Sequence, residues 1–266
     1  MSMKKLSIYG SLIAALSLNI ASAHFQMLYT PESALPQGGT IPVKAVFTHP
    51  FADEHTMDMA APQEFYAIHK GQKTDLKEML KPIEWTGNSN KAQAFTTDYK
   101  ARGMGDHVLV LTPEPYLETN EDTYIQQITK MLVNVAGLPT DWDENLGLKA
   151  EIVPLTKPYA VWAGSTFTGV VMSEGKPVPF TEVEIEYLNS DIDVAKNQTG
   201  ALKYQAPQES FNTLIVKTDA NGTFTFGMPK AGWWGFAAVG VGPDKTYQGK
   251  ELSQDAVIWV QAKEMQ

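Results

Sequence analysis

The sequence predicts an all-β protein made of two antiparallel β-sandwich domains in tandem, with little helix. Three observations predict this fold class. In several short segments apolar and polar residues alternate, which is the period of a strand with one buried face. These segments recur at a spacing of about ten residues, separated by turns rich in Gly, Pro, Asn and Asp. The period of an amphipathic helix is missing from nearly the whole sequence.

The first 23 residues have the pattern of a secretory signal. Met1–Lys5 is basic, Leu6–Ile20 is mostly apolar, and Ala21–Ala23 supplies a small-x-small cleavage site. The apolar stretch has 15 residues, fewer than the roughly 18 that a membrane-spanning helix needs. We therefore expect a periplasmic protein without a membrane span, whose signal peptide, residues 1–23, is removed so that His24 becomes the first residue.

The first sandwich is expected over residues 24–154. Its clearest strands are apolar, β-branched segments that begin or end at Gly or Pro, namely Thr40–Phe47, Glu64–His69 and Asp106–Thr112. The segment 122–135 is ambiguous, because its apolar residues fit both a strand and a short helix. A helix is slightly favoured for the first half of that segment.

The second sandwich is expected over residues 155–266. In 179–187 three apolar residues point to one side and three glutamates to the other, namely Val183, Ile185 and Tyr187 against Glu182, Glu184 and Glu186. The turn Asp219–Gly222 is typical of a hairpin between two further strands. Residues 189–210 are polar and predict a loop.

The composition excludes several classes of function. The chain has 266 residues, a formal net charge of -9 and no cysteine. An acidic protein is a poor partner for nucleic acid or for an anionic membrane surface. Without cysteine there are no disulfides, thiolate metal ligands or thiol nucleophiles. The common catalytic motifs for a nucleophilic serine, a phosphate loop or a zinc protease helix are also missing, so we expect a binding protein and not an enzyme.

Histidines indicate a metal site. Three of the five lie near two short segments, the expected mature N-terminus and residues 49–59. Imidazole suits nickel, copper and zinc, while a thioether favours copper(I). The expected ligands are the three histidines, with one methionine and two aspartates as lesser candidates that complete or tune the site: His24, His49 and His55, then Met57, Asp58 and Asp53.

Cleavage before His24 has a chemical consequence. It converts the amide nitrogen of His24 into an amine, whose pKa of about 7.7–8.0 allows deprotonation near neutral pH. The amine and the ring nitrogen of one residue then chelate one metal ion. One further imidazole would complete a three-nitrogen arrangement, a histidine brace.

Other residues of the same types have simpler interpretations. His69 follows a strand beside Lys70 and is expected at the surface, and His107 alternates with Val108 as an ordinary strand residue. Neither is expected to bind metal. The two methionines of residues 57–59 also fit core packing, since they lie on one side of a strand. A group of acidic residues is expected on a solvated face, namely Glu114, Glu118, Glu121 and Asp122.

Several motifs together resemble a bacterial periplasmic family, the domain of unknown function 4198. They are Ala23–Phe25, His49–Phe51 with His55 and Met57–Met59, Asp141–Asp143 with Gly147, Glu151–Leu155 and Gly232–Phe236. The resemblance implies a periplasmic component of nickel or cobalt uptake that works with an inner-membrane transporter. The second half also resembles the carboxypeptidase-regulatory-like sandwich, a scaffold without catalytic residues, in Gly169–Val171, Gly175–Val178 and Thr218–Gly222.

The main hypothesis is therefore a periplasmic protein that captures nickel or cobalt and delivers the ion to an uptake system in the inner membrane. A second hypothesis is a copper histidine-brace protein, either a copper carrier or an oxygenase that acts on polysaccharide. A third is a metal-free sugar-binding or adhesion sandwich, in which Trp233 and Trp234 would form an exposed platform.

Overall fold

The computed structural model describes residues 24–265, so the signal peptide expected over residues 1–23 lies outside the described residues. The all-β prediction is confirmed. The described part of the chain contains strands and two short 3-10 helices, η1 (Lys77–Met79) and η2 (Glu209–Phe211). Within residues 24–265, no helix has the length and apolar character needed to cross a bilayer.

The strands form three sheets. The first, the β3 sheet, contains β1 (Phe25–Tyr29), β3 (Gly39–Thr48), β8 (Lys91–Ala101), β7 (Lys81–Thr86), β18 (Gln198–Leu202) and β17 (Ser190–Asp193), with β4 (Thr56–Met57) beside β3. The smallest, the β14 sheet, contains β12 (Glu151–Pro154), β14 (Thr166–Ser173), β15 (Lys176–Pro177) and β20 (Thr223–Gly227).

The third sheet, the β11 sheet, has twelve strands. Its main path contains β19 (Leu214–Lys217), β16 (Glu182–Tyr187), β21 (Gly232–Ala238), β23 (Lys250–Lys263), β11 (Thr123–Val135), β9 (Gly105–Thr112), β5 (Glu64–His69) and β6 (Gln72–Asp75). Four short strands are attached to it, β2 (Ala34–Leu35), β10 (Tyr116–Glu118), β13 (Val161–Trp162) and β22 (Thr246–Tyr247).

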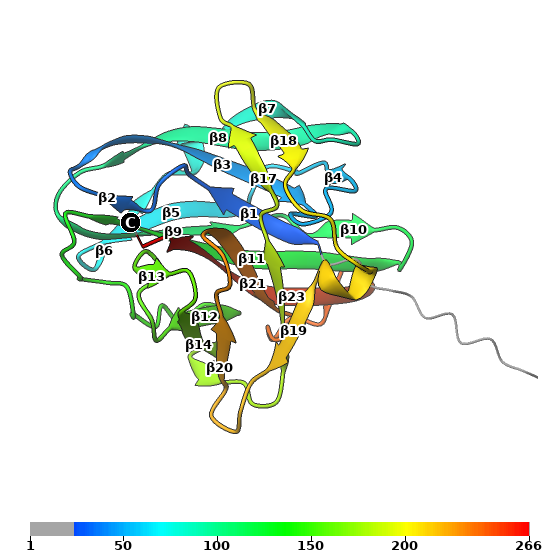
Figure 1. Cartoon of the computed structure of the whole chain (residues 1–266). Coiled ribbons are helices and arrows are strands. Elements are labelled where there is room, and N and C mark those ends of the chain that lie inside the picture. The colour runs from blue at the N-terminus through cyan, green and yellow to red at the C-terminus, as the bar shows by residue number, and fades with distance from the viewer. Residues whose placement is uncertain (1–23, 266) are drawn as a thin grey trace, which may run out of the picture.

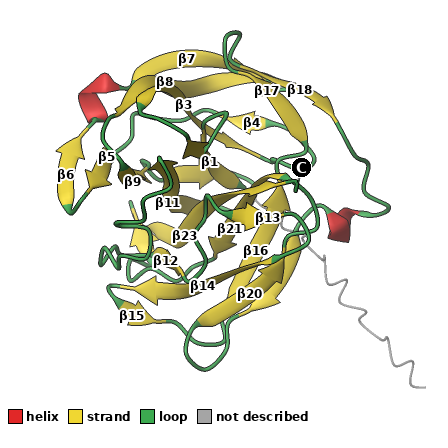
Figure 2. Cartoon of the chain, turned by 60° about the vertical axis from the view of Figure 1, so that its left-hand side comes forward, coloured by secondary structure: helices red, strands yellow, loops and turns green. Residues whose placement is uncertain are grey.

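The β11 sheet is the middle layer of three, between the β3 sheet and the β14 sheet (Figures 1 and 2). Because side chains alternate across a strand, each of its central strands supplies two cores. The first core lies between the β3 and β11 sheets, and the second core lies between the β11 and β14 sheets. In β23, Trp259 packs into the first core with Phe25, whereas Ile258 and Val260 pack into the second core. Strands buried on both faces need continuous apolar sequence, which explains the run Val108–Leu111 in β9.

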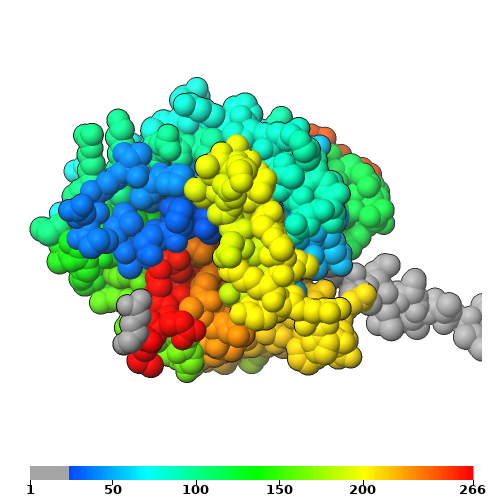
Figure 3. All heavy atoms as spheres, turned by 45° about the horizontal axis from the view of Figure 1, so that its top comes forward, coloured from blue at the N-terminus to red at the C-terminus, as the bar shows by residue number. Residues whose placement is uncertain are grey.

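Two local expectations were wrong. Residues 123–135 form one long strand and no helix, because Met131 is needed in the first core and Leu132 in the second. The segment 189–210, expected as a loop, contains β17 and β18. β18 joins the β3 sheet beside β7, and this segment, yellow in Figure 3, runs over the surface next to the first strands.

The two halves of the sequence share a sheet. β11, from the first half, pairs in parallel with β23, from the second, through eight residue pairs from Tyr124–Leu252 to Met131–Trp259. The division into 24–154 and 155–266 stays a prediction. The β11–β23 pairing is one observation that bears on it. It joins the expected units through the centre of the molecule.

We expect residues 155–266, expressed alone, to show no cooperative unfolding transition. Without β11, strand β23 loses its parallel partner, and the first-core face that carries Val257 and Trp259 becomes exposed to water. Circular dichroism during a urea titration checks this. Co-expression with residues 24–154 is the control and should restore the transition, while a cooperative fragment alone would support the original boundary.

Candidate metal centre

Three histidines meet at one end of the β3 sheet because of strand register. His24 directly precedes β1, and His49 directly follows β3. β1 and β3 are antiparallel with Phe25 opposite Thr48, so the residues just outside this pair lie side by side. His55 precedes β4, which returns along β3 with Thr56 opposite Thr48. The register therefore carries all three side chains to the same place.

The three imidazoles form a compact group. One ring nitrogen from each lies within 4.8 Å of the other two. The ring centroids are separated by 4.6 Å between His24 and His49, 4.9 Å between His49 and His55, and 6.1 Å between His24 and His55. His49 is buried at 2% exposure, His24 is half-buried and His55 is exposed. The group therefore has a rigid inner side and a solvent-facing side.

The geometry fits a first-row transition metal. Metal to imidazole bonds are about 2.0–2.1 Å, so two ligands of one ion lie no more than about 4 Å apart. The present separations, at most 4.8 Å, exceed that distance by less than about 1 Å. The donor set, three imidazoles without a thiolate, is one that suits nickel, copper and zinc.

Glu118 joins this group, contrary to the expectation of a solvated face. Its Oε2 lies 3.2 Å from Nε2 of His24, and the residue is only 7% exposed. A ligating histidine ordinarily donates its second ring N–H to a carboxylate, which fixes the tautomer. Glu118 at Nε2 leaves Nδ1 of His24 for a metal, and Nδ1 is the ring nitrogen nearer to the backbone amine. No local sequence signal marks Glu118, since the pairing of β10 with β11 positions it.

The lesser ligand candidates lie differently. Met57 sits opposite Phe47 in the β3–β4 pair and is buried in the first core. Asp58 is exposed, and its Oδ1 accepts a hydrogen bond of 2.6 Å from the backbone N–H of Gln93. Neither Asp58 nor Asp53 belongs to the set of convergent donors found among the described His, Asp and Glu side chains.

Asp53, the other aspartate, is buried and has a structural partner. Its Oδ2 accepts a hydrogen bond of 2.7 Å from the backbone N–H of Asn88. Burial raises the pKa of the Asp53 carboxyl. These contacts organise the loop that carries His55.

The other two histidines form a separate pair. The rings of His69 and His107 stack at 4.1 Å between centroids and 5° between planes. Nδ1 of His107 lies 2.8 Å from the hydroxyl of Tyr99, and Nδ1 of His69 lies 2.8 Å from the carbonyl oxygen of Asp106. Burial lowers the pKa of His107. His107 is thus a hydrogen-bonded strand residue, as expected, and His69 is half-buried where an exposed position was expected.

Two cavities adjoin the histidine group. An acidic cavity of 610 Å³ has His49 in its wall together with four glutamates, Glu54, Glu184, Glu186 and Glu209. Burial raises the pKa of Glu184 to about 7 and that of Glu186 to about 8. Oε2 of Glu186 accepts a hydrogen bond from the backbone N–H of Phe51, two residues after His49. At neutral pH the carboxyls of Glu184 and Glu186 therefore carry less than their full negative charge.

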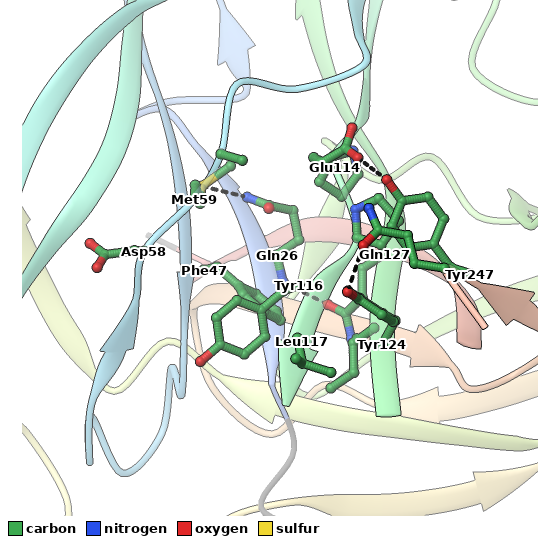
Figure 4. A pocket seen from close by; sticks show the side chains of 15 residues that line it. Gln26, Phe47, Asp58, Met59, Glu114, Tyr116, Leu117, Tyr124, Gln127 and Tyr247 are labelled. Atoms are coloured by element: carbon green, nitrogen blue, oxygen red, sulfur yellow. Dashed lines mark hydrogen bonds between the residues drawn. The ribbon is translucent and has the colours of Figure 1, made fainter. Parts of the chain in front are cut away.

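The second, the aromatic pocket, has a volume of 270 Å³, and Figure 4 shows side chains that line it. Phe47 and Tyr116 line it, and the ring of each also contacts the ring of His24, at 5.6 and 6.5 Å between centroids. Gln127 lines it as well, and its Nε2 donates a hydrogen bond of 2.7 Å to the carbonyl oxygen of His24. The metal centre and the aromatic pocket therefore share a wall.

A family model described as domain of unknown function (DUF4198) matches residues 21–242. The chain belongs to the DUF4198 family. The match covers all three histidines of the centre, the β3 sheet and most of the β11 sheet. No curated protein matches this DUF4198 chain.

Solved structures similar to this DUF4198 chain are distant. The D0-D1 domain of Intimin is 13% identical over 90% of this chain and 100% of its own, with a TM-score of 0.22. The adhesin InvE of Yersinia pseudotuberculosis is 13% identical over 88% and 58%, with a TM-score of 0.25. A putative carbohydrate binding protein from Bacteroides uniformis is 9% identical over 77% and 90%, with a TM-score of 0.24. Similarities at this level carry no argument about the DUF4198 chain.

Proposed function

We propose that this protein is a periplasmic carrier that binds nickel or cobalt and delivers the ion to an uptake system in the inner membrane. One observation carries the proposal, namely the convergence of the imidazoles of His24, His49 and His55 within 4.8 Å. Export through cleavage after Ala23, suggested by the sequence, adds the amine of His24 to these donors.

The chain's own residues have separate roles in this proposal. His24 supplies its amine and Nδ1, and deprotonating the amine at neutral pH costs only about 1 kcal/mol. Oε2 of Glu118 lies 3.2 Å from Nε2 of His24, so its negative charge favours a proton on that nitrogen and leaves Nδ1 for the metal. His49 supplies a buried imidazole, and His55 an exposed one that is free to rotate away from the ion. An incompletely enclosed ion exchanges more readily than one in a closed four-ligand structural site, which suits transfer to a partner.

A copper protein is the second candidate, because an amine and imidazoles on one ion form a histidine brace, and copper binds nitrogen donors more tightly than nickel or cobalt. A polysaccharide oxygenase of this kind requires activity with a reductant and a glycan, and assaying both separates it from a carrier.

The metal-free sugar-binding hypothesis loses its main feature, because Trp233 and Trp234 are only 4% and 5% exposed. They are packed in the two cores and form no surface platform.

We expect His49→Ala and His55→Ala each to weaken nickel and cobalt binding by about tenfold or more, since a lost ligand costs at least as much as a lost outer contact. His69→Ala and His107→Ala should leave affinity unchanged, because that pair is separate from the convergent donors. Isothermal titration of the mature protein with each metal measures this, with the N-terminus checked by intact mass.

Thermal unfolding of all four variants is the control, because His107→Ala removes a buried partner of Tyr99 and is expected to lower stability without affecting the metal. Unchanged affinity in His49→Ala and His55→Ala would show that the metal does not bind at this end of the β3 sheet. Metal analysis of protein purified from the periplasm then identifies the cargo.

A further inference from the structure

The aromatic pocket has walls made of two aromatic pairs. Phe47 of β3 and Tyr116 of β10 meet edge to face at 5.3 Å between centroids, and Tyr124 of β11 and Tyr247 of β22 do so at 4.9 Å. Figure 4 shows these side chains around the opening. Its volume of 270 Å³ lies just below the range of about 300–1,000 Å³ typical of drug-sized ligands. The pocket therefore has room for a small ligand only.

The charged residues that line the aromatic pocket are all acidic. Asp58 and Glu114 are among its lining residues, and the described lining contains no Lys, Arg or His. The pKa of Tyr116 is raised by burial and also by the nearby carboxylates of Glu118 and Asp58. The hydrogen bond to Glu114 raises the pKa of Tyr247. An anionic ligand is therefore disfavoured.

The lining also uses many of its hydrogen-bond donors internally. The hydroxyl of Tyr124 donates to Gln248 at 3.1 Å, and that of Tyr247 donates to Glu114. The side-chain amide of Gln127 donates to the carbonyl oxygen of His24 and to Asp255. What these groups still offer to a ligand is oxygen lone pairs and ring faces. A sugar needs donors as well as acceptors, so this lining suits it less well.

We propose that the aromatic pocket binds a small organic cation, a substituted ammonium group, next to the metal centre. Aromatic faces attract such cations through their quadrupoles, and the attraction is larger where water is excluded. Asp58 and Glu114 supply the countercharge. The cation does not depend on the proposed metal, because none of the groups that would hold it is among the convergent histidines.

The test compares choline with 3,3-dimethyl-1-butanol, its neutral carbon isostere, by calorimetric titration of the mature protein after treatment with a chelator. We expect saturable binding of choline at least tenfold tighter than that of the isostere. Tyr124→Leu and the charge variants Asp58→Asn and Glu114→Gln should each weaken choline binding at least threefold. Tyr124→Phe keeps the ring and should retain binding.

Tyr204→Leu is the matched control, since Tyr204 is 43% exposed and lies outside the pocket. Asp58→Asn keeps the oxygen that accepts from Gln93, so its fold should be intact and its result decisive. Equal affinity for choline and its isostere would overturn the proposal, as would no saturable binding of either or choline binding that is insensitive to all pocket variants. Tighter binding of a neutral sugar such as glucose would also overturn it and would assign a sugar site.

Discussion

A mature chain with one extra glycine before His24 is expected to bind nickel and cobalt about a hundredfold more weakly, or worse. All five imidazoles remain, but the nitrogen of His24 becomes an amide that ligates only by losing a strongly held proton. The new terminal amine cannot close the same chelate ring with Nδ1 of His24. Changes outside the ligand shell already cost about tenfold to a hundredfold, so the loss of a ligand should cost more.

The extension should leave the fold intact. The carbonyl oxygen of His24 is fixed by Gln127, and Phe25 is fully buried in the first core, so the backbone after His24 has little freedom to move. The ring of His24 also keeps its contact with Glu118. The added residue then extends the chain away from β1, and thermal unfolding should match that of the mature protein.

A second background makes the glycine experiment specific. In His24→Ala, the chelate is already lost, so the same glycine extension should cause little further loss of affinity. Titration of the four proteins forms a double-mutant cycle whose coupling measures the chelate. If the extended protein with His24 binds nickel, cobalt and copper as tightly as the mature protein, the amine is not a ligand and the site is an ordinary histidine group.

Much of this centre was predictable from the sequence because its signals are local. His24 gains importance from the cleavage site beside it, and His49 and His55 lie six residues apart in a loop after a clear strand. What the sequence does not contain is the register of β1 against β3, which brings His24 to the other two. Register follows from the burial of one face of these strands, such as Phe25 of β1 and Val43 of β3, in the first core, and not from any motif.

The rest could not be predicted because it depends on pairing between distant segments. Glu118 reaches His24 only through the β10–β11 hairpin. β11 and β23 are separated by more than a hundred residues, and each has the sequence of a strand buried on both faces. In the first half of β11 this run is interrupted by Gln126 and Gln127, so its apolar residues fit the period of a short helix as well as that of a strand.

Lys130 belongs to a buried ion pair whose disruption is expected to be strongly destabilising. Its Nζ lies 2.6 Å from Oε1 of Glu151 in β12, and the residues are 2% and 1% exposed. Backbone N–H groups of Leu146 and Leu148 also donate to the Glu151 carboxylate. Removing one partner of such a pair costs about 3–5 kcal/mol, because the other charge is left buried. We expect a loss of that size in the free energy of unfolding for Glu151→Leu, measured by urea titration.

Lys130→Met should cost less than Glu151→Leu. In Lys130→Met the Glu151 carboxylate still accepts two backbone hydrogen bonds, whereas in Glu151→Leu the Nζ of Lys130 loses its acceptor Glu151. The double variant should recover part of the loss, since apolar residues replace a buried ion pair at little cost, while the backbone N–H groups of Leu146 and Leu148 still lack their acceptor. Burial lowers the pKa of Lys130, so in Glu151→Leu the unfolded chain binds the extra proton and stability should rise as pH increases toward the ordinary lysine pKa of about 10.4. A Glu151→Leu protein as stable as the wild type at pH 7, or one whose stability falls over that range, would mean that the pair does not hold β11 to β12.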